Sequence, residues 1–267
     1  MQMQMPVTYK APVQLRADPV ALPKIWPLKA FKGTTNYDRK AFKEHLRACA
    51  KGDLPRIQAE LKRCRSNVPY TVLTHCFTKD EHDADNPVKR FPRKKYIWEM
   101  LKEINDSPRI AIPKSRQIMI TWTVMAYLVV KAVFWRHRLI FCQSKKEEDA
   151  AMLIDRGKHI YEHLPWWMKQ ASPLKRPLHK LPFNKIIFTN GSMLWGVPQG
   201  ADVLRQYTAS IIFGDESAFQ EKAEGAYKAA KPTVDGGGQI ILVSSANGKN
   251  FFYRICYDRM DASNEAL

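Results

Sequence analysis

The sequence has few cysteines, and none of them form a C-x-x-C pair. The five present are odd in number and scattered along the chain, at Cys49, Cys64, Cys76, Cys142 and Cys256. A disulfide framework is therefore not expected, and the pattern favours a reduced, intracellular protein. A metal site built on His75, Cys76 and His82 is disfavoured, because the sequence offers no second pair of cysteine and histidine ligands.

Acidic residues are also scarce. Against 43 lysines and arginines there are 26 aspartates and glutamates, which leaves a formal charge of +17 and a pI near 9.7. An excess of this size favours a polyanionic partner, either a nucleic acid or an anionic membrane surface.

Long uninterrupted apolar runs are missing as well. The first residues lack the apolar core of a secretory signal, and the mostly apolar segment 118–135 carries Thr121, Thr123 and Lys131. We expect this segment to be a buried helix instead of a membrane span.

Local patterns divide the chain into three regions. Five prolines in residues 1–38 discourage long helices, so an irregular N-terminal arm is expected there. Residues 39–90 are expected to form a small helical N-terminal region, with helices at 38–50 and 54–64 and a polar loop at 80–92.

From residue 91 to residue 267, short apolar runs alternate with helical segments. This alternation is typical of an α/β domain with a mostly parallel sheet and crossover helices. The predicted helices are 121–135 and 145–163, and the predicted strands are 109–112, 139–142, 186–189 with 193–197, 211–213 and 240–243.

The stretch S-I-I-F-G-D-E-S-A-F at 210–219 places two acids at the end of an apolar run. Such a run predicts a buried strand that delivers Asp215 and Glu216 to the edge of the sheet. In nucleotide hydrolases the first acid of such a pair holds Mg²⁺ and the second activates the attacking water. The alternative is a strand that ends in two solvated acids.

The junction between the first predicted strand of the core and its helix reads A-I-P-K-S-R-Q-I-M-I-T-W, and it does not match G-x-x-x-x-G-K-[ST]. Aligning Thr121 with the metal-binding hydroxyl places Met119 at the second glycine and Ile120 at the usual lysine. The junction nevertheless concentrates cations and hydrogen-bonding groups between two apolar elements, where an anion would compensate them. The alternative is a strand end whose cations reach water. The groups concerned are Lys114, Ser115, Arg116 and Gln117.

A third apolar strand, at 240–243, runs into small polar residues. Ser244, Ser245 and Asn247 offer hydrogen bonds to a γ-phosphate or to the catalytic glutamate. An ordinary exit from the strand through Asn247-Gly248 explains them equally well.

In this order, the three motifs resemble the ATPase domain of the large terminase subunit of tailed bacteriophages, the motor that packages DNA into capsids. The resemblance covers roughly residues 91–258. It rests on K-S-R-Q with Thr121, on I-I-F-G-D-E-S-A-F, and on V-S-S-A-N-G followed by N-F-F-Y. The segments R-L-I-F-C-Q-S-K-K-E-E-D-A-A and N-G-S-M-L-W-G-V-P-Q-G look like the family's second strand and helix and its hairpin.

The resemblance implies a P-loop NTPase of the type with an additional strand and a catalytic glutamate. It implies that Thr121 and Asp215 hold Mg²⁺, that Glu216 activates water, and that Arg116 is an arginine finger acting in cis. The coupling motif would be Ser244, Ser245 and Asn247. The ATP-binding segment, corresponding to Walker A, would comprise Lys114, Ser115, Arg116, Gln117, Ile118, Met119, Ile120 and Thr121. Because many family members have Gly-Lys in place of Met119-Ile120, Lys114 must supply the phosphate-binding charge.

The same resemblance implies Mg²⁺-dependent ATP hydrolysis coupled to translocation of double-stranded DNA. The partners it implies are double-stranded DNA, a portal protein, a small terminase subunit and further copies of the chain in a pentameric ring, in the host cytoplasm. The chain ends soon after the coupling motif, so neither a nuclease domain nor nuclease activity is expected. The alternatives are a helicase-like ATPase and a DNA-binding remnant with an inactive nucleotide site.

Two basic clusters are candidate DNA contacts, with solvated faces or portal-docking surfaces as the alternative. Arg205 could reach the nucleotide of a neighbouring subunit, although a salt-bridged surface arginine is favoured. The first cluster is Lys89, Arg90, Arg93, Lys94 and Lys95, and the second, near Trp166 and Trp167, is Lys169, Lys175, Arg176 and Lys180.

Overall fold

A computed structural model describes residues 39–115, 119–200 and 202–257. Contacts divide the chain into two compact units, Met1–Lys62 and Arg63–Leu267. The division therefore falls earlier than the predicted boundary between residues 90 and 91. Residues 63–90 join the larger unit because helix α3 (Val68–His75) packs on α4 (Lys95–Asp106) and α5 (Ile120–Phe134).

The first unit contains the predicted helical pair, α1 (Arg39–Ala50) and the start of α2 (Leu54–Ser66). Between them Gly52 has φ +94°, and the Asp53 carboxylate accepts a hydrogen bond from the backbone N–H of Arg56 at 3.1 Å. His45 of α1 and Glu60 of α2 form a buried contact, 2.9 Å between Nε2 and Oε2. The turn and this contact hold the two helices together.

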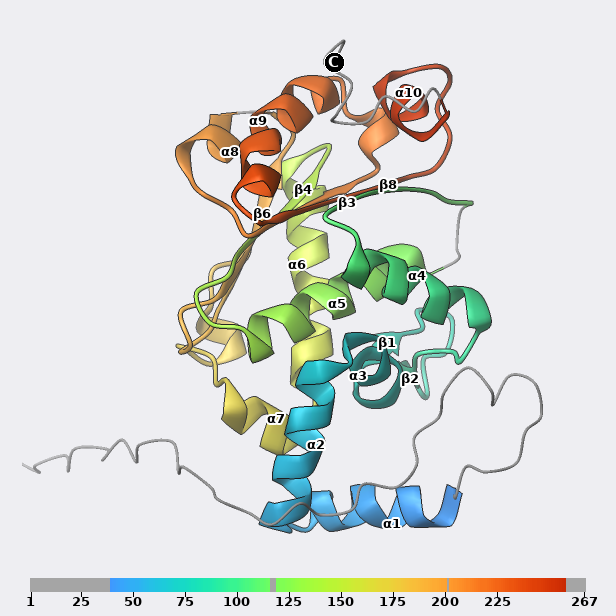
Figure 1. The fold of residues 1–267 in the computed structure, drawn as a ribbon, viewed down its shortest axis with the longest axis vertical. Coiled ribbons are helices and arrows are strands. Elements are labelled where there is room, and N and C mark those ends of the chain that lie inside the picture. The colour runs from blue at the N-terminus through green and yellow to red at the C-terminus, as the bar shows by residue number, and fades with distance from the viewer. Residues whose placement is uncertain (1–38, 116–118, 201, 258–267) are drawn as a thin grey trace, which may run out of the picture. The chain divides into compact units, whose positions relative to one another are not determined.

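The second unit is built on a six-stranded sheet with the order β3-β8-β7-β4-β6-β5 (Figure 1). Every neighbouring pair is parallel except β5 and β6, which form an antiparallel hairpin. This confirms the predicted mostly parallel α/β fold. The strands are β3 (Arg109–Pro113), β4 (Leu139–Ser144), β5 (Lys185–Ile187), β6 (Met193–Pro198), β7 (Ile211–Asp215) and β8 (Gln239–Ser244).

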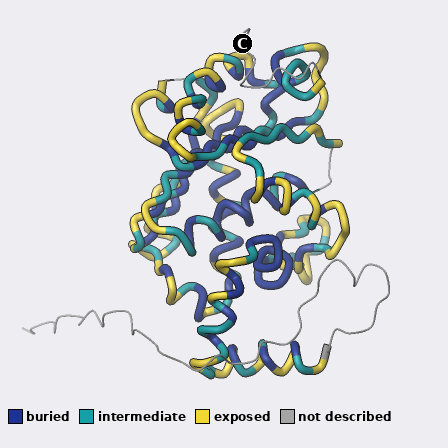
Figure 2. The backbone as a smooth tube through the Cα atoms, in the orientation of Figure 1, coloured by how far each residue is buried: buried dark blue, intermediate teal, exposed yellow. Residues whose placement is uncertain are grey.

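The central elements are apolar because they are covered on all sides. All five residues of β7 are buried, as expected of a strand inside a parallel sheet with both faces covered. Eleven residues of α5 are buried, and the helix packs against α3, α4 and α6 (Glu147–Glu162). The tube in Figure 2 is dark blue or teal along β7 and α5. No helix in the described part of the chain is long and apolar enough to cross a membrane.

Several smaller elements differ from the expectation. The segment 80–92, expected to be a loop, contains β2 (Val88–Arg90), which pairs antiparallel with β1 (Phe77–Lys79). Strands β7 and β8 extend to Asp215 and Ser244, past the predicted ends of their apolar runs. The remaining elements are α7 (Trp166–Ala171), η2 (Leu178–Lys180), α8 (Asp202–Gln206), η3 (Ser217–Phe219), α9 (Ala223–Asp235) and α10 (Phe251–Tyr257).

Candidate nucleotide site

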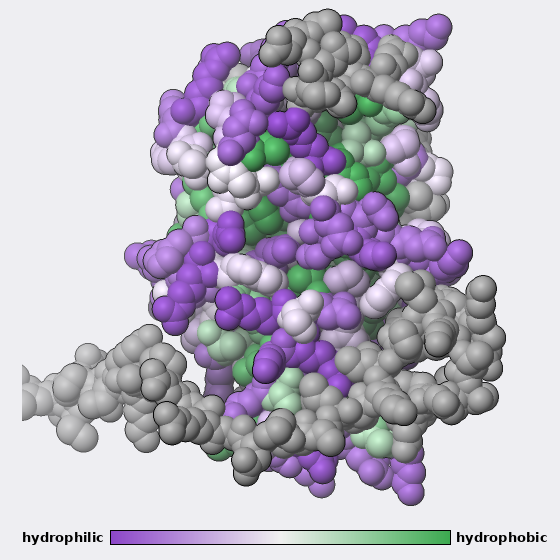
Figure 3. All heavy atoms as spheres, viewed as in Figure 1, coloured by the Kyte–Doolittle hydropathy of each residue, from purple (hydrophilic) through white to green (hydrophobic). Residues whose placement is uncertain are grey.

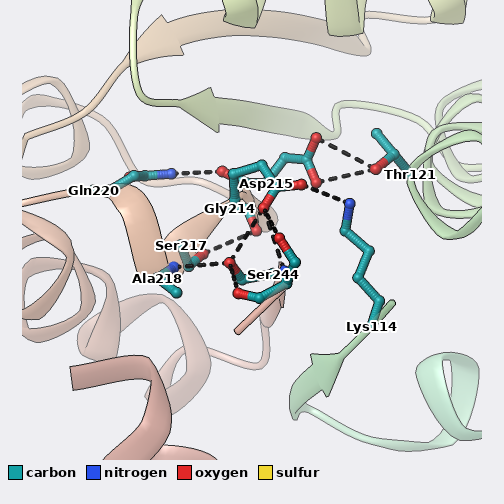
Figure 4. Close-up of polar contacts among 10 residues, drawn as sticks. Lys114, Thr121, Gly214, Asp215, Ser217, Ala218, Gln220 and Ser244 are labelled. Carbon is teal, nitrogen blue, oxygen red and sulfur yellow. Dashed lines mark hydrogen bonds and ion pairs between the residues drawn. The ribbon is translucent and has the colours of Figure 1, made fainter. Parts of the chain in front are cut away.

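Three parallel strands bring the sequence motifs together at one edge of the sheet. Pro113 of β3 lies opposite Ser244 of β8, and Val243 of β8 lies opposite Asp215 of β7. The backbone N–H of Lys114 continues this pairing with a 2.9 Å hydrogen bond to the carbonyl of Ser244. The residues that follow each strand therefore face one another (Figure 4).

Thr121, in the first turn of α5, donates its hydroxyl to the Asp215 carboxylate, with distances of 3.1 and 3.3 Å to the two oxygens. Burial raises the pKa of Asp215, as does the charge of Glu216, while Lys114, Thr121 and Arg156 oppose that rise. A hydroxyl beside a buried carboxylate is an oxygen donor set that suits Mg²⁺, and the bound cation would compensate the cost of burying the charge. The residues present thus fit the predicted metal ion.

Glu216 is held from two sides. Its Oε1 atom accepts a 2.7 Å hydrogen bond from the Lys114 ammonium, and its Oε2 atom accepts a 3.1 Å hydrogen bond from the Ser245 hydroxyl. Burial alone would raise the pKa of Glu216, but the hydrogen bond and charge of Lys114, together with Ser245, lower it below its ordinary value. The carboxylate is therefore ionised at neutral pH and able to accept a proton.

The backbone at Glu216 is also unusual, with φ +49° and ψ +44°. A residue other than glycine costs on the order of 1–3 kcal/mol in such a left-handed conformation, and this strain is tolerated only where the surroundings fix it. The conformation turns the chain out of β7 directly after Asp215. As a result, the two adjacent carboxylates meet different partners.

Ser244, the last residue of β8, and the residues that follow it contact the acidic motif. The Ser244 hydroxyl lies 3.3 Å from Glu216 Oε2 and accepts a 3.0 Å hydrogen bond from the backbone N–H of Ala218. Asn247 donates its side-chain amide to the carbonyl of Ala218 at 2.9 Å. The structure thus brings Ser244 and Ser245 to the glutamate, and Asn247 to the segment immediately after it.

The described residues of the predicted phosphate segment lie at its two ends. Met119, which aligns with the second glycine of a phosphate loop, has φ +58° and precedes the first residue of α5. Glycine adopts this left-handed backbone conformation without strain, whereas methionine adopts it only at a cost in free energy. Ser115 is exposed and Ile120 is buried at the start of α5, whereas Arg116, Gln117 and Ile118 lie outside the described residues.

A pocket of about 440 Å³ lies between these motifs. Sequence reasoning missed one of its walls, which is formed by the end of β4 and the first turns of α6. Because β4 is parallel to β7, the start of α6 reaches the same edge of the sheet, but the resemblance of this strand and helix assigned no site residue to them. The residues lining the pocket are Lys114, Thr121, Ser144, Lys145, Asp149, Met152, Leu153, Arg156, Asp215, Glu216, Phe219 and Ser245.

The two basic clusters differ in how they are engaged. In the first cluster, Lys89 forms an ion pair with Asp83, and Arg90 donates to the carbonyl of Thr74 at 2.9 Å. In the second cluster, Lys169 donates to the carbonyl of Glu162 at 2.9 Å, whereas its other three cations, Lys175, Arg176 and Lys180, are exposed. Arg93, Lys94 and Lys95 of the first cluster are exposed as well. Arg205 is 66% exposed and lies 4.0 Å from Asp202, in agreement with a surface arginine that has a nearby acid.

The strand order defines the class of fold. β8 is inserted between β3, which leads into α5, and β7, which carries the acids, and this is the arrangement of a P-loop NTPase with an additional strand and a glutamate after the acidic strand. The predicted fold class is therefore confirmed.

Solved structures with a similar fold include large terminases of bacteriophages. The crystal structure of the HK97 bacteriophage large terminase matches 73% of this chain and 40% of its own, with a TM-score of 0.54 and 11% identity. The Thermus phage P74-26 large terminase ATPase domain matches 62% of this chain and 74% of its own, with a TM-score of 0.44 and 16% identity. No protein-family model matches. The chain shares its fold with the HK97 large terminase, and it spans about two fifths of that protein.

Proposed function

We propose that this chain is the ATPase motor domain of a terminase large subunit, which couples Mg²⁺-dependent ATP hydrolysis to translocation of double-stranded DNA into a procapsid. One observation carries the proposal. Lys114, Thr121, Asp215 and Glu216, which come from motifs far apart in the sequence, line one pocket at the carboxyl edge of the sheet. The fold shared with the HK97 large terminase supports the same function.

In this proposal, the start of α5 and Lys114 bind the phosphates of ATP. Backbone N–H groups at a helix N-terminus attract anions, and Lys114 adds a full positive charge on a side chain that is only 12% exposed. Thr121 and Asp215 would hold Mg²⁺, which when bound neutralises charge on the phosphate oxygens. Arg116 remains a predicted arginine finger in cis.

Glu216 is the proposed general base. Its ionised carboxylate accepts a proton from the attacking water. The ammonium of Lys114 contacts the same carboxylate, so a phosphate oxygen that enters the pocket competes with Glu216 for Lys114. That competition would free Oε1 of Glu216 to receive the proton when the nucleotide is in place.

In this proposal, hydrolysis is coupled to movement of DNA through the contacts that Glu216 and Ala218 make with the end of β8. Ser244 and Ser245 touch Glu216, and Asn247 touches Ala218, so a shift of Glu216 alters the hydrogen bonds at the end of β8. Asn250 also donates to the Ala218 carbonyl at 2.7 Å and caps the start of α10 by accepting from the backbone N–H of Tyr253. This connection supports the assignment of Ser244, Ser245 and Asn247 as a coupling motif.

The proposed partners follow from this function and from the charge of the chain. They are double-stranded DNA, a portal protein, a small terminase subunit and further copies of the chain in a pentameric ring, assembled on the procapsid in the host cytoplasm. The exposed cations of the second basic cluster are a candidate contact for the DNA backbone, as are the exposed cations of the first.

The experiment is a Glu216→Gln substitution, with ATP hydrolysis and nucleotide binding measured on the same preparation. Loss of the base should reduce the turnover of ATP by about 100-fold or more while binding is retained. Glu99→Gln is the matched control, because Glu99 is exposed and pairs only with Lys95 on α4 within the described residues. Near-normal hydrolysis by Glu216→Gln would contradict the proposal, and stronger stimulation by single-stranded than by double-stranded DNA would favour a helicase-like ATPase.

A further inference from the structure

Arg156 lies on the wall of the nucleotide pocket that no motif identified. It is part of α6, which follows β4, and it lines the same pocket as Thr121, Asp215 and Glu216. The other lysine and arginine side chains that line the pocket among the described residues are Lys114, at the end of β3, and Lys145, just before α6. Arg156 therefore brings a guanidinium to the pocket from a different element than the phosphate loop.

An aromatic ring supports this guanidinium. The central carbon of the Arg156 guanidinium lies 5.8 Å from the centroid of the Trp122 ring. Trp122 directly follows Thr121 on α5, and its ring also meets His159, one turn along α6 from Arg156, edge to face at 5.6 Å. An arginine stacked on an aromatic ring keeps its N–H groups available in the plane of the guanidinium. Trp122 thus orients Arg156 beside the proposed metal-binding residue Thr121.

The guanidinium of Arg156 has no direct acidic partner within the described residues, although Asp149, Asp215 and Glu216 line the same pocket. No ion pair or hydrogen bond of its guanidinium is present in the described part of the chain, and Asp155, its neighbour on α6, pairs with Lys158 at 3.2 Å. Its charge acts on the buried carboxylate of Asp215 across the pocket. A half-buried guanidinium without an acidic partner is costly unless an anion occupies the space in front of it.

We propose that Arg156 is a further phosphate-binding residue of this pocket, which donates guanidinium hydrogen bonds to oxygens of the bound polyphosphate from the α6 side. The inference rests on the proposed function, since it names a contact of the same nucleotide. It adds a recognition element that lies outside the phosphate loop. A planar donor fork on this wall would favour polyphosphates, which offer it several oxygens, over monophosphates.

The test is equilibrium binding of two probes in the presence of Mg²⁺, a non-hydrolysable ATP analogue and inorganic tripolyphosphate, to the full chain. We expect Arg156→Gln to weaken both by roughly 10- to 100-fold, because a hydrogen-bonded charge is removed. Arg156→Lys, which keeps the charge but not the fork, should lie between Arg156→Gln and the unsubstituted chain. Lys158→Gln removes one positive charge from the same helix outside the pocket and should leave both affinities unchanged.

The outcomes that contradict the inference can be told apart from those that contradict the proposed function. Equal affinities for the unsubstituted chain and Arg156→Gln would reject the role of Arg156 and leave the proposed function standing. A loss for the ATP analogue without a loss for tripolyphosphate would reject a phosphate contact. Absence of binding by the unsubstituted chain would reject the proposed function and the inference together. Thermal unfolding of each variant identifies loss of fold, and if Arg156→Gln does not fold, unchanged affinities in Arg156→Lys reject the inference.

Discussion

Asp215 and Glu216 are neighbours in the chain, yet their surroundings shift their acidities in opposite directions. Asp215 is buried, which raises its pKa, and Lys114 and Thr121 compensate only in part. Burial also acts on Glu216, but the close contact with Lys114 outweighs it and the pKa falls below its ordinary value. The left-handed backbone at Glu216 allows this difference, because it separates the two side chains immediately after β7.

This contrast predicts opposite effects of two substitutions on stability. Asp215→Asn should stabilise the fold at neutral pH, because the folded state then no longer holds a buried charge. The pKa of Asp215 is higher in the folded than in the unfolded state, so the gain is largest above the folded pKa. It disappears as the pH falls below the unfolded value, where both states are protonated. Urea unfolding of the unsubstituted chain and Asp215→Asn from pH 8 to pH 4 measures the effect.

Glu216→Gln is the matched control for that measurement. The pKa of Glu216 is lower in the folded state, so its carboxylate contributes stability above the unfolded pKa, and that contribution is lost as the pH falls through the folded pKa. Glu216→Gln should therefore destabilise the fold at neutral pH. If Asp215→Asn and Glu216→Gln both stabilised the fold, the two carboxylates would not differ in the way described.

For single residues, the sequence pointed to Asp215, Glu216, Thr121 and Lys114, but it did not point to the residues of α6, such as Arg156, that line the same pocket. An apolar run that ends in two acids is visible in one segment, whereas the position of Arg156 depends on how β4 pairs with β7. The positive φ of Met119 could not be predicted from its residue type, because residues other than glycine rarely adopt it. Positions that depend on pairing between distant strands cannot be read from local pattern.

Strand β6 and helix α6 approach each other unusually closely at Gly196. A Cβ atom there would lie 2.7 Å from the carbonyl oxygen of Ala150 and 2.9 Å from Cγ1 of Ile154. The carbonyl belongs to the helix backbone and cannot rotate away, so the helix itself would have to move. This glycine sets the distance between α6 and the sheet, and therefore the position of the pocket wall that α6 provides.

Gly196→Ala should destabilise the fold by about 1–3 kcal/mol through overpacking. The control is Gly225→Ala in the exposed part of α9, where no atom lies within 4 Å of the added Cβ. That substitution should stabilise the fold by about 0.5–1 kcal/mol, since alanine is the better helix former. Urea unfolding of both variants makes the comparison, and a neutral Gly196→Ala would contradict the close packing of β6 on α6.

The elements that the sequence predicted best are those with continuous apolar runs. β3, β4, β7, β8 and α5 were all expected near their observed bounds. Burial leaves a strong apolar pattern in β4, β7, β8 and α5, whereas β3 lies at the edge of the sheet and is only partly buried. β2 was missed because V-K-R alternates and carries no apolar run. α4 was missed although its buried residues Ile97, Leu101 and Ile104 recur at the spacing of an amphipathic helix. The antiparallel pairing of β5 with β6 agrees with the expected hairpin, because the short connection through Asn190-Gly191 cannot hold the crossover that a parallel pair needs.

Over the whole molecule, positive charge exceeds negative charge by 17. Hydrophilic residues, in purple, cover much of the face in Figure 3. Such an excess supports binding to a polyanion without sequence preference, as a motor that moves along DNA requires. The order of the chemical motifs along the chain predicted the fold class, but the division at Lys62 and Arg63 was not predicted, since no helix was expected at α3, which packs on α4 and α5.

Replacement of Lys175, Arg176 and Lys180 together by glutamine should weaken binding to double-stranded DNA equally for all sequences. It should also lower the slope of log affinity against log salt by about 0.9 for each DNA phosphate that the variant no longer neutralises. Fluorescence anisotropy with a labelled duplex at several salt concentrations measures both quantities. The control replaces three other exposed lysines, Lys43, Lys102 and Lys222, so that the net charge changes by the same amount.

Equal reductions of affinity in the two triple variants would show that net charge, and not the second basic cluster, determines DNA affinity. An unchanged salt slope in the cluster variant would place the DNA-binding surface elsewhere on the chain. Either result would leave the nucleotide site unaffected, because none of the six substituted residues lines that pocket.

The most direct test of the central claim is a calorimetric titration of a non-hydrolysable ATP analogue into this chain, with and without Mg²⁺, and into Lys114→Ala. Binding is measured instead of turnover because it does not require neighbouring subunits to complete the site. The account predicts Mg²⁺-dependent binding by the unsubstituted chain and an affinity lower by roughly 10-fold or more in Lys114→Ala, which removes the charge that replaces the usual phosphate-loop lysine. Binding that is absent, independent of Mg²⁺, or unchanged in Lys114→Ala would contradict it.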